Sequence, residues 1–377
     1  MSALFQNYHR RPVHLVEGKG TYVWDDQQKR YVDFTSGIAV LTLGHCPEEL
    51  VQAMKAQSEK LWHTSNLYTS HAQEKLAHDL VKDTHLAHAF FCNSGTEANE
   101  AAIKLVRKYT KKHKMITFEQ SFHGRTFAAM SATGQAKVHS DFGPIVDTFE
   151  YVPFNDVAAL EAAVDDETAA IMLEVVQGEG GVHVVTPEFA EAIQHICDEK
   201  GILLVVDEVQ TGIARSGTRY AFEQTALKPH IVTLAKGLGG GFPIGAMLGT
   251  AELFDTFNAG THGSTFGGNP MAMAIAQTIV DVTFNDPFLE KVKASSTYFK
   301  EQLAIHLPEV EVRGMGLLLG MELTQPIPEV VAACEEKGLL VVGAGATTLR
   351  LLPPLNVSQQ EIDEAVQILK QVMLVNV

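Results

Sequence analysis

Two short apolar stretches of the chain each end in residues that can do chemistry. Residues 202–206 (ILLVV) run into the carboxylates of Asp207 and Glu208, and residues 231–234 (IVTL) lead to Lys236 and a glycine-rich loop. Apolar runs of this length are typical of strands buried on both faces of a parallel sheet, and open α/β sheets bind ligands at the carboxyl ends of their strands. Two neighbouring strand ends would therefore bring Asp207 and Lys236 to one edge.

An aspartate and a lysine at one sheet edge suit the chemistry of pyridoxal 5′-phosphate (PLP). This cofactor needs a carboxylate beside its pyridinium nitrogen and a lysine that binds its aldehyde carbon. Taken alone, each residue has a plainer interpretation, because a strand-end aspartate is more often a turn residue and a lysine is usually solvated. The PLP hypothesis therefore depends on further motifs along the chain.

The composition predicts a folded protein without nucleic acid or membrane partners. A chain of 377 residues, 46% apolar and 20% charged, is too long for one core and suggests two domains. Its net charge of −16 repels nucleic acid phosphates and anionic membranes. No apolar run reaches the ~18 residues of a membrane span, and residues 1–15 lack the apolar core of a secretory signal. We therefore expect a soluble, cytoplasmic protein.

The cysteines and histidines show no metal-binding pattern, so no metal is assigned. The 16 histidines include no H-E-x-x-H sequence. The cysteines are far apart, which predicts buried free thiols in a reducing compartment. They are Cys46, Cys92, Cys197 and Cys334.

Helix-like and strand-like patterns alternate through the middle of the chain, which predicts β–α–β units and a parallel sheet with right-handed crossovers. The predicted fold is α/β, with a large domain (61–270) that has a mostly parallel sheet between helices and a smaller α+β domain (271–377). An N-terminal segment (1–60) is expected to pack with the small domain. Strands are expected at 89–92, 115–118, 170–175, 202–206, 231–234, 311–323, 339–342 and 348–352. Helices are expected at 47–61, 71–81, 187–200 with Gly201 as C-cap, 271–307, 328–337 and 358–373, and one that opens within 93–100 extends to about residue 112, after a hairpin at 18–36.

The sequence NSGTEANE at 93–100 is a candidate anion site. It follows the expected strand at 89–92 and opens a helix, where free backbone N–H groups and the helix dipole favour a phosphate. A simple capped helix start is an equally good interpretation of this segment alone.

Six motifs, in one order along the chain, resemble those of the class III (ω-) aminotransferases. They are NSGTEANE (93–100), FHGRT (122–126), QGEGG (177–181), DEVQTG (207–212), AKGL (235–238) and STFGGNP (264–270). The resemblance covers nearly the whole chain and implies the PLP-dependent transferase fold of type I. The FHGRT loop and HTSNLY (63–68) are most similar to members that act on N-acetylornithine. One departure is Thr96, where many members have alanine; its hydroxyl is still able to donate to a phosphate.

The resemblance also implies how the motifs hold PLP. Lys236 would bind the cofactor covalently and, once released, move a proton between the donor carbon and the cofactor's C4′. Asp207 would keep the pyridine nitrogen protonated. The other expected contacts are Val209 and Phe122 on the two ring faces, Gln210 near the phenolic oxygen, and Gly95 and Thr96 at the phosphate.

The segment Ser264–Thr265 would act on the neighbouring subunit. In the family this loop reaches the partner's phosphate, which implies a homodimer with shared active sites. Thr265 is therefore expected to contact the cofactor, and Ser264 is counted with the substrate-binding residues.

The substrate side is expected to use two arginines for two carboxylates. By resemblance, Arg125 would receive the α-carboxylate of an acylated diamino acid through a bidentate fork. Arg350, in an otherwise apolar strand, would receive the α-carboxylate of 2-oxoglutarate, and Glu179 would mask it while the first substrate reacts. The glycines beside Glu179 are expected to leave its loop free to move. The plainer alternatives are a surface arginine at 125 and a water-facing edge-strand arginine at 350.

Together these expectations predict transfer of the δ-amino group of N2-acetylornithine to 2-oxoglutarate. The products would be N-acetylglutamate 5-semialdehyde and glutamate, in arginine biosynthesis. Transaminases of succinylornithine, N-acyl-diaminopimelate, ornithine or 4-aminobutyrate, and an aminomutase on the same fold, stay open as alternatives. A non-catalytic binding module is a different alternative, against which the presence of both Lys236 and Asp207 argues.

Overall fold

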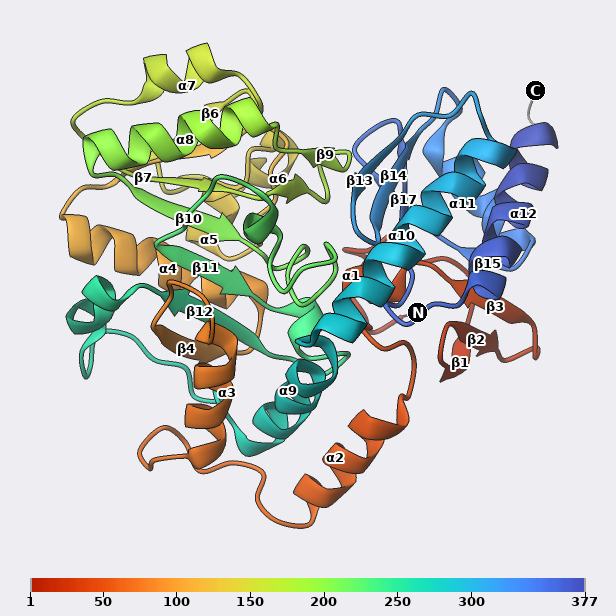
Figure 1. Ribbon diagram of the computed structural model, residues 1–377, viewed down its shortest axis with the longest axis horizontal. Helices are drawn as coiled ribbons and strands as arrows, with labels where there is room; N and C mark the ends of the chain where they lie inside the picture. The colour runs from red at the N-terminus through yellow and green to blue at the C-terminus, as the bar shows by residue number, and fades with distance from the viewer. Residues whose placement is uncertain (1, 376–377) are drawn as a thin grey trace.

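The computed structural model describes residues 2–375 as two lobes built on separate sheets (Figure 1). The large lobe contains a seven-stranded sheet in the order β4-β12-β11-β10-β7-β5-β6. β12 is antiparallel to both of its neighbours, and the other adjacent pairs are parallel, which confirms the expected mostly parallel sheet. The strands are β4 (His88–Cys92), β5 (Lys114–Phe118), β6 (Phe149–Val152), β7 (Thr168–Leu173), β10 (Leu203–Asp207), β11 (Ile231–Leu234) and β12 (Gly245–Gly249).

Strand β10 shows why the sequence at 202–206 is apolar without interruption. Leu203 and Val205 pack in one core cluster and Leu204 and Val206 in another, because successive side chains of a strand point to opposite faces. Both faces of the sheet are covered by helices, as Figure 1 shows. The covering helices are α4 (Gly95–Thr110) on the first face, and α3 (His71–Val81), α8 (Pro187–Lys200) and α9 (Pro270–Thr283) on the second.

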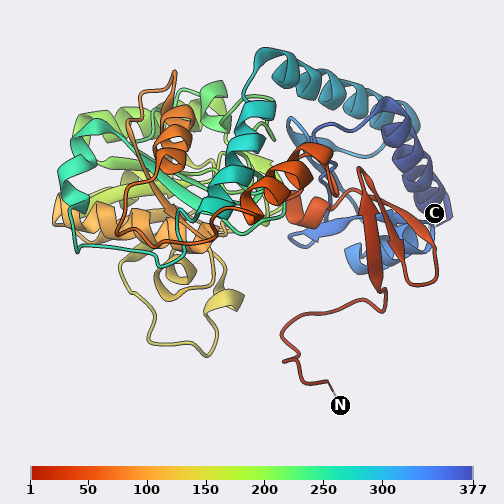
Figure 2. The same cartoon turned by 90° about the horizontal axis from the view of Figure 1, so that it is seen from below.

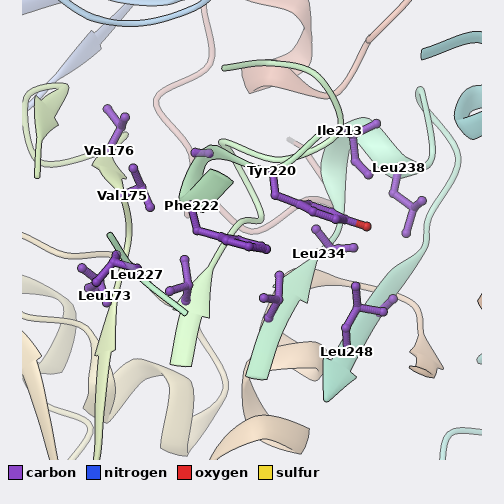
Figure 3. Packing of buried hydrophobic residues seen from close by; sticks show 14 of the residues in the cluster. Leu173, Val175, Val176, Ile213, Tyr220, Phe222, Leu227, Leu234, Leu238 and Leu248 are labelled. Atoms are coloured by element: carbon purple, nitrogen blue, oxygen red, sulfur yellow. The ribbon is translucent and has the colours of Figure 1, made fainter. Parts of the chain in front are cut away.

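The second-face cluster also holds the segment that follows β10 (Figure 3). Tyr220 and Phe222 stack with ring centroids 5.5 Å apart, above Leu234 and Leu248 of the sheet. The buried hydroxyl of Tyr220 donates to the carbonyl oxygen of Leu80 at 2.6 Å, so its polar atom is satisfied. This packing anchors residues 220–222, which follow the end of β10 along the chain, on the second face of the sheet.

The small lobe joins the two ends of the chain. One four-stranded sheet, β1-β2-β3-β15, pairs the N-terminal strands with a C-terminal strand, and a second has the order β13-β14-β17-β16. Figure 2 shows this lobe beside the large one, with the N-terminal segment leading away from it. The strands are β1 (Leu15–Lys19), β2 (Tyr22–Asp25), β3 (Arg30–Asp33), β13 (Val312–Met315), β14 (Leu318–Glu322), β15 (Leu339–Leu340), β16 (Val342–Ala344) and β17 (Thr348–Leu351). The helices are α10 (Asp286–His306), α11 (Ile327–Glu336) and α12 (Gln359–Val375).

Two predicted elements of the C-terminal half are divided in the structure. The single strand expected over 311–323 is a hairpin, because Gly316 has a φ of +57° and turns the chain between β13 and β14. The helical region expected over 271–307 is interrupted after Thr283, and Asn285 caps the second helix by accepting from the Phe288 N–H. Turn residues within an apolar pattern account for both errors.

The predicted domain boundaries at residues 60 and 270 stay a prediction. The packing shows which core each neighbouring segment joins. Strands β1–β3 lie in the small lobe, as expected for the N-terminal segment. Helix α2 (Glu48–Ser58), however, packs on α9, and both contribute to the core of the large sheet. Phe299 and Leu303 of α10 belong to the small-lobe core, so the chain crosses between the cores near residue 284.

A left-handed turn of unusual length lies between β3 and α2. Its residues 36–39 (α1, Ser36–Ala39) have φ values of 45°, 62°, 66° and 60°, including the β-branched Ile38. Left-handed backbone strains residues with a Cβ, so the surroundings must hold it in place. The Asp33 carboxylate does so by accepting from the backbone N–H groups of Thr35 and Ser36 and pairing with His45 at 2.8 Å.

Agreement is best where a helix carries its own end signals. The helices expected at 71–81 and 187–200 are confirmed to the residue, and Gly201 ends the second with a φ of +62°. Strands β1, β6 and β12, and the two-residue strands at 176–177 and 183–184, were not predicted, and Cys46 is exposed rather than buried. No helix within residues 2–375 is long and apolar enough to cross a membrane. The remaining short elements are α5 (Phe127–Ala132), α6 (Ala136–His139), α7 (Val157–Ala163), β8 (Val176–Gln177), β9 (His183–Val184), and the 3-10 turns Ala221–Gln224, Lys236–Leu238 and Ala251–Phe257.

Candidate active site

A cavity of about 400 Å³ opens where β10 and β11 end, and most of the expected site residues line it. They come from the start of α4, the loop after β5, the end of β10 and the turn after β11. The expected residues in its lining are Gly95, Thr96, Phe122, Arg125, Asp207, Val209, Gln210 and Lys236. A larger hollow of about 520 Å³ beside β4 has none of them in its lining. The sheet edge therefore brings together Asp207 and Lys236, as the sequence predicts.

Asp207 is buried and held from three sides. Its Oδ1 accepts from the Val209 N–H at 3.0 Å, and its Oδ2 accepts from the Asn99 amide at 2.8 Å. The same Oδ2 lies 2.8 Å from Nδ1 of His123, whose ring is fully buried. Three partners fix the carboxylate in one orientation at the cavity wall, which is what a charge partner for a bound ring requires.

The electrostatics behind Asp207 depend on a buried histidine and a buried glutamate. Burial disfavours the charged His123 ring, but the hydrogen bond and charge of Asp207 outweigh it and raise the histidine pKa. Burial, and the nearby charge of Asp207, raise the pKa of Glu174 to about 7. The Glu174 carboxylate accepts from the N–H groups of Phe122 and Gly178, and so ties the FHGRT loop to the QGEGG loop.

Sequence reasoning missed Asn99, His123 and Glu174 as supporting residues. Asn99 and His123 lie inside two of the recognised motifs. No nearby sequence feature indicates that they contact Asp207, which is more than 80 residues further along the chain. Glu174 did leave a signal, because it is a carboxylate within an apolar segment, IMLEVV. A charge in such a segment is buried only with partners.

Lys236 sits in a strained turn at the cavity wall. Its φ is +41°, in the left-handed region that residues with a Cβ avoid. Burial lowers the pKa of its amine, Arg350 adds to this, and the carboxylates of Glu179 and Asp207 oppose it. The same turn is anchored by the Thr42 hydroxyl, which donates to the carbonyl oxygen of Gly237 at 2.8 Å. A strained lysine with a lowered pKa is typical of a functional site.

The start of α4 forms another part of the cavity wall. Ser94 caps this 16-residue helix by accepting from the Glu97 N–H, and Ser94, Gly95 and Thr96 all line the cavity. The expected hydroxyl contact from Thr96 has a competitor, because the Thr126 hydroxyl donates to Glu100 and lies 2.7 Å from that of Thr96. The single hydroxyl proton of Thr96 is then engaged with Thr126. The backbone N–H groups are left as the donors for an anion here.

Arg350 and Glu179 are outside the cavity lining and form an ion pair beside it, where both contact the cavity-lining Gln210. Arg350 is fully buried, and its two terminal nitrogens lie 2.6 and 3.1 Å from the Glu179 carboxylate oxygens. Nη1 also donates to the carbonyl oxygen of Gly178 and to the side-chain oxygen of Gln210. Burial raises the pKa of Glu179, but Arg350 outweighs it and holds the pKa below its ordinary value. Gln210, expected near the cofactor ring, thus lies in the ion-pair cluster as well as in the cavity lining.

Residues 178–181, here called the acid loop, differ from the mobile loop that the glycines suggested. Gly178, Gly180 and Gly181 are all buried. A Cβ on Gly178 would meet the Gln210 side chain at 2.3 Å, and one on Gly180 would meet the carbonyl oxygen of Gln120 at 2.6 Å. These glycines allow close packing rather than free movement.

The remaining substrate residues lie at the rim or outside it. Arg125 is exposed, lines the cavity and lies over the Phe122 ring, 5.6 Å from its centroid. Ser264 accepts from the Asn93 amide at 3.0 Å, whereas Thr265 is exposed and outside the cavity lining. The structure of one chain therefore does not bring Ser264 and Thr265 to its own site.

Comparison with known proteins identifies the family. A family profile described as aminotransferase class-III matches residues 4–373. The chain belongs to the class III aminotransferases. The acetylornithine aminotransferase of Listeria monocytogenes serotype 4b is 52% identical over 377 residues, which cover 99% of this chain and 97% of that one. The acetylornithine aminotransferase of Bacillus subtilis is 49% identical over 375 residues, with 98% and 97% covered.

Solved structures of this family share the fold. The N-acetylornithine aminotransferase of Stenotrophomonas maltophilia has a TM-score of 0.86 at 37% identity, covering 98% of this chain and 97% of that one. An ornithine aminotransferase from Toxoplasma gondii has a TM-score of 0.93 at 32% identity, covering 99% and 92%. These likenesses confirm the expected PLP-dependent transferase fold and its α/β class.

PLP is the cofactor of class III aminotransferases, and the residues here fit it. The T. gondii enzyme is described with PLP partially occupying its active site. In this chain the buried Asp207 would hold the pyridinium nitrogen, the free N–H groups at the start of α4 would hold the phosphate, and Lys236 would bind the aldehyde carbon. All three lie on the walls of one cavity, so the donor set matches the cofactor's three ends.

Proposed function

We propose that this class III aminotransferase moves the δ-amino group of N2-acetylornithine to 2-oxoglutarate, in arginine biosynthesis. The observation that carries the proposal is the fully buried Arg350, paired with Glu179 beside the cavity of Lys236 and Asp207. A buried arginine with a removable carboxylate partner suits an enzyme that must alternately refuse and accept an α-carboxylate at one position. The 49–52% identity to named acetylornithine aminotransferases supports this choice of donor.

The chain's own residues supply proton transfer and charge. When bound, PLP supplies an electron sink for the carbon that loses its proton. Asp207 keeps a positive charge on the bound ring, and its three partners prevent it from turning away. The Nζ of Lys236 has a lowered pKa, so more of the amine is neutral and able to accept the donor-carbon proton and return it.

Two arginines divide the substrates between them. Arg125, at the exposed rim, binds the α-carboxylate of acetylornithine, so that the distant δ-amino group reaches the reacting centre. During this half-reaction Glu179 neutralises Arg350 and keeps α-carboxylates away from it. In the second half-reaction the Glu179 side chain turns away, and Arg350 binds the α-carboxylate of 2-oxoglutarate beside the reacting carbon.

A panel of amino donors with 2-oxoglutarate tests the proposal. The panel contains acetylornithine, succinylornithine, ornithine, 4-aminobutyrate and an N-acyl-diaminopimelate, and the measurement is kcat/KM for glutamate formation. We expect acetylornithine to have the highest value. Ornithine in first place would replace the proposed donor, and this alternative is included because ornithine aminotransferases share the fold with a TM-score of 0.93. Protein that stays colourless with added PLP would remove the enzyme proposal altogether.

We also propose a cytoplasmic homodimer in which the Ser264–Thr265 loop completes the partner's site. The exposure of Thr265, away from the cavity of its own chain, supports an action in trans, and the four free cysteines suit a reducing compartment. Thr265→Asp and Lys236→Ala should each be inactive alone. Mixed and reassembled, they should recover about a quarter of wild-type activity, because about half of the dimers are hybrids with one intact site. No recovery would contradict the shared site.

A further inference from the structure

The acid loop is held along its backbone by the small lobe. Three of its carbonyl oxygens accept hydrogen bonds, each from a different small-lobe element: β17, the β16–β17 turn and β13. The bonds are Arg350 Nη1 to Gly178 at 2.7 Å, Gly345 N–H to Glu179 at 2.9 Å, and Arg313 Nε to Gly181 at 2.9 Å. A loop movement that carried Glu179 away from Arg350 would break all three bonds, whereas a rotation of the Glu179 side chain would break none of them.

Arg313 is itself rigidly placed. Its side chain is only 16% exposed. Nη2 donates to the Glu322 carboxylate at 2.6 Å and to the Thr348 hydroxyl at 2.8 Å, while Nε reaches across to Gly181. A planar guanidinium makes these bonds in fixed relative directions, so the position of β14 and β17 determines where the Gly181 carbonyl lies.

The sheet that carries Arg350 also packs directly against the chain after the acid loop. Gly320 of β14 is the register partner of Arg350 in β17. A Cβ on Gly320 would lie 2.8 Å from the Cβ of Val182, closer than real Cβ atoms approach. The strand therefore touches Val182 only because residue 320 has no side chain. A shift of this sheet would consequently displace the acid loop as well.

We propose that Arg313 is a positioning residue for amino-donor choice: its bond to Gly181 keeps the acid loop in the place where the Glu179 carboxylate meets Arg350. This inference rests on the proposed function, because it takes Glu179 as the mask of Arg350. With the backbone held by these three bonds, masking and unmasking are rotations of the Glu179 side chain. Without the Arg313 bond, the loop gains freedom, and Glu179 covers Arg350 for less of the time.

The test is the ratio of kcat/KM for acetylornithine to that for glutamate as amino donor. Arg313→Met keeps much of the apolar length but removes every donor. We expect the ratio to fall by about threefold to tenfold, since the acid loop loses one charge-assisted bond while the bonds to the carbonyl oxygens of Gly178 and Glu179 remain. Arg313→Lys, which keeps the charge beside Glu322 but not the fork, should shift the ratio less in the same direction, and it takes the place of the methionine variant if that variant does not fold. An unchanged ratio in a folded variant overturns the inference.

A double variant separates positioning of Glu179 from general structural damage. In a Glu179→Ala background there is no carboxylate to position, so adding Arg313→Met should change the ratio by less than about twofold. Full additivity of the two substitutions would show that Arg313 acts in some other way.

Arg219 offers a matched control. Like Arg313, it donates to backbone carbonyls, those of Lys82 and Asp83, and pairs with a glutamate, Glu223. Its side chain is 22% exposed, close to the 16% of Arg313. Arg219→Met should therefore leave the donor ratio at the wild-type value. A shift equal to that of Arg313→Met would mean that the ratio reports loss of any partly buried arginine, which would overturn the inference.

Hydrogen exchange gives a readout that does not depend on turnover. A peptide covering residues 174–185 should exchange faster in Arg313→Met and at the wild-type rate in Arg219→Met. Unchanged exchange in this peptide contradicts the proposal that Arg313 holds the acid loop, even if activity changes. A wild-type enzyme with no preference for acetylornithine would contradict the proposed function. If Glu179→Ala shifts the ratio and Arg313→Met does not, the proposed function stands and only the role of Arg313 is contradicted.

Discussion

Removal of the Glu179 carboxylate should make the enzyme accept α-amino donors. In the wild type, an α-carboxylate reaches Arg350 only after Glu179 gives up its two contacts of 2.6 and 3.1 Å. A hydrogen bond to a charged group contributes about 1.5–3 kcal/mol. The Glu179 side chain is 29% exposed, and Arg350 keeps its bonds to Gly178 and Gln210, so we take about 2 kcal/mol as the net barrier to unmasking.

This free energy sets the expected change in the ratio of kcat/KM values for the two donors. With about 1.4 kcal/mol per factor of ten, Glu179→Ala should raise kcat/KM for glutamate relative to acetylornithine by about 30-fold. Single-turnover measurements of each half-reaction, followed by cofactor absorbance, give both constants. Glu179→Gln is the matched control, because its amide oxygen still accepts from Arg350 without the charge, and it should give an intermediate ratio. A ratio within about twofold of wild type in Glu179→Ala would refute the masking role.

The same pair predicts a flat pH dependence of donor choice. Because Arg350 lowers the pKa of Glu179, the stabilisation from the pair is present above the ordinary carboxyl pKa and is lost only as the pH falls through the lowered value. The ratio should therefore be constant from about pH 6 to about pH 9. A ratio that changes with a midpoint in this range would show that another group controls access to Arg350.

Four further substitutions test other parts of the site and core. Lys236→Ala should abolish transamination while circular dichroism and Tm show a folded protein, and near-wild-type turnover would exclude the lysine from the mechanism. Asp207→Asn should keep bound PLP but lose turnover by the equivalent of ~3–5 kcal/mol, and a loss below about tenfold would contradict its role. Arg125→Lys should harm the acetylornithine half-reaction far more than the 2-oxoglutarate one, and equal damage would remove the assignment. Burial raises the pKa of Glu208 to about 7, so its ionisation should lower stability by up to ~3 kcal/mol as the pH rises from about 4.5 to above 7. Glu208→Gln should shrink the difference in Tm across that range, and an unchanged difference would show that Glu208 is not its source.

The sequence was informative wherever a pattern is local. Strand β10 was predicted because both of its faces are buried, so no polar residue interrupts it before Asp207. Helix α8 was predicted to the residue because Pro187 and Gly201 mark its start and its end, and the structure adds Thr186 as its N-cap. Strand β12 (GAMLG) has small residues where strands usually have β-branched ones, because Gly245 lies against the backbone of Ser94, so its pattern did not identify it.

The local sequence pattern does not reveal the contacts that orient the site residues. Lys236 and Asp207 were identified because cofactor chemistry demands both residue types, and their motifs are contiguous. The partners of Asp207, and the hold of Arg313 on Gly181, are pairings between segments that only the folded chain brings together. The glycines of the acid loop were misjudged for the same reason, since a glycine that permits close packing and one that permits movement look identical in a sequence.

The pairing of β3 with β15 constrains how the protein is made. Val32 and Asp33 pair with Leu339 and Leu340, so strands that leave the ribosome first wait for about 300 residues of synthesis before their sheet is complete. At ~5–20 residues per second, that delay is roughly 15 to 60 s, longer than folding of a typical small domain. Throughout it, β3 presents an unpaired edge that other chains can bind. Nascent chains should therefore depend on chaperones until residue 340 emerges, and a truncation that removes β15 should release the N-terminal strands as well as the C-terminal helix.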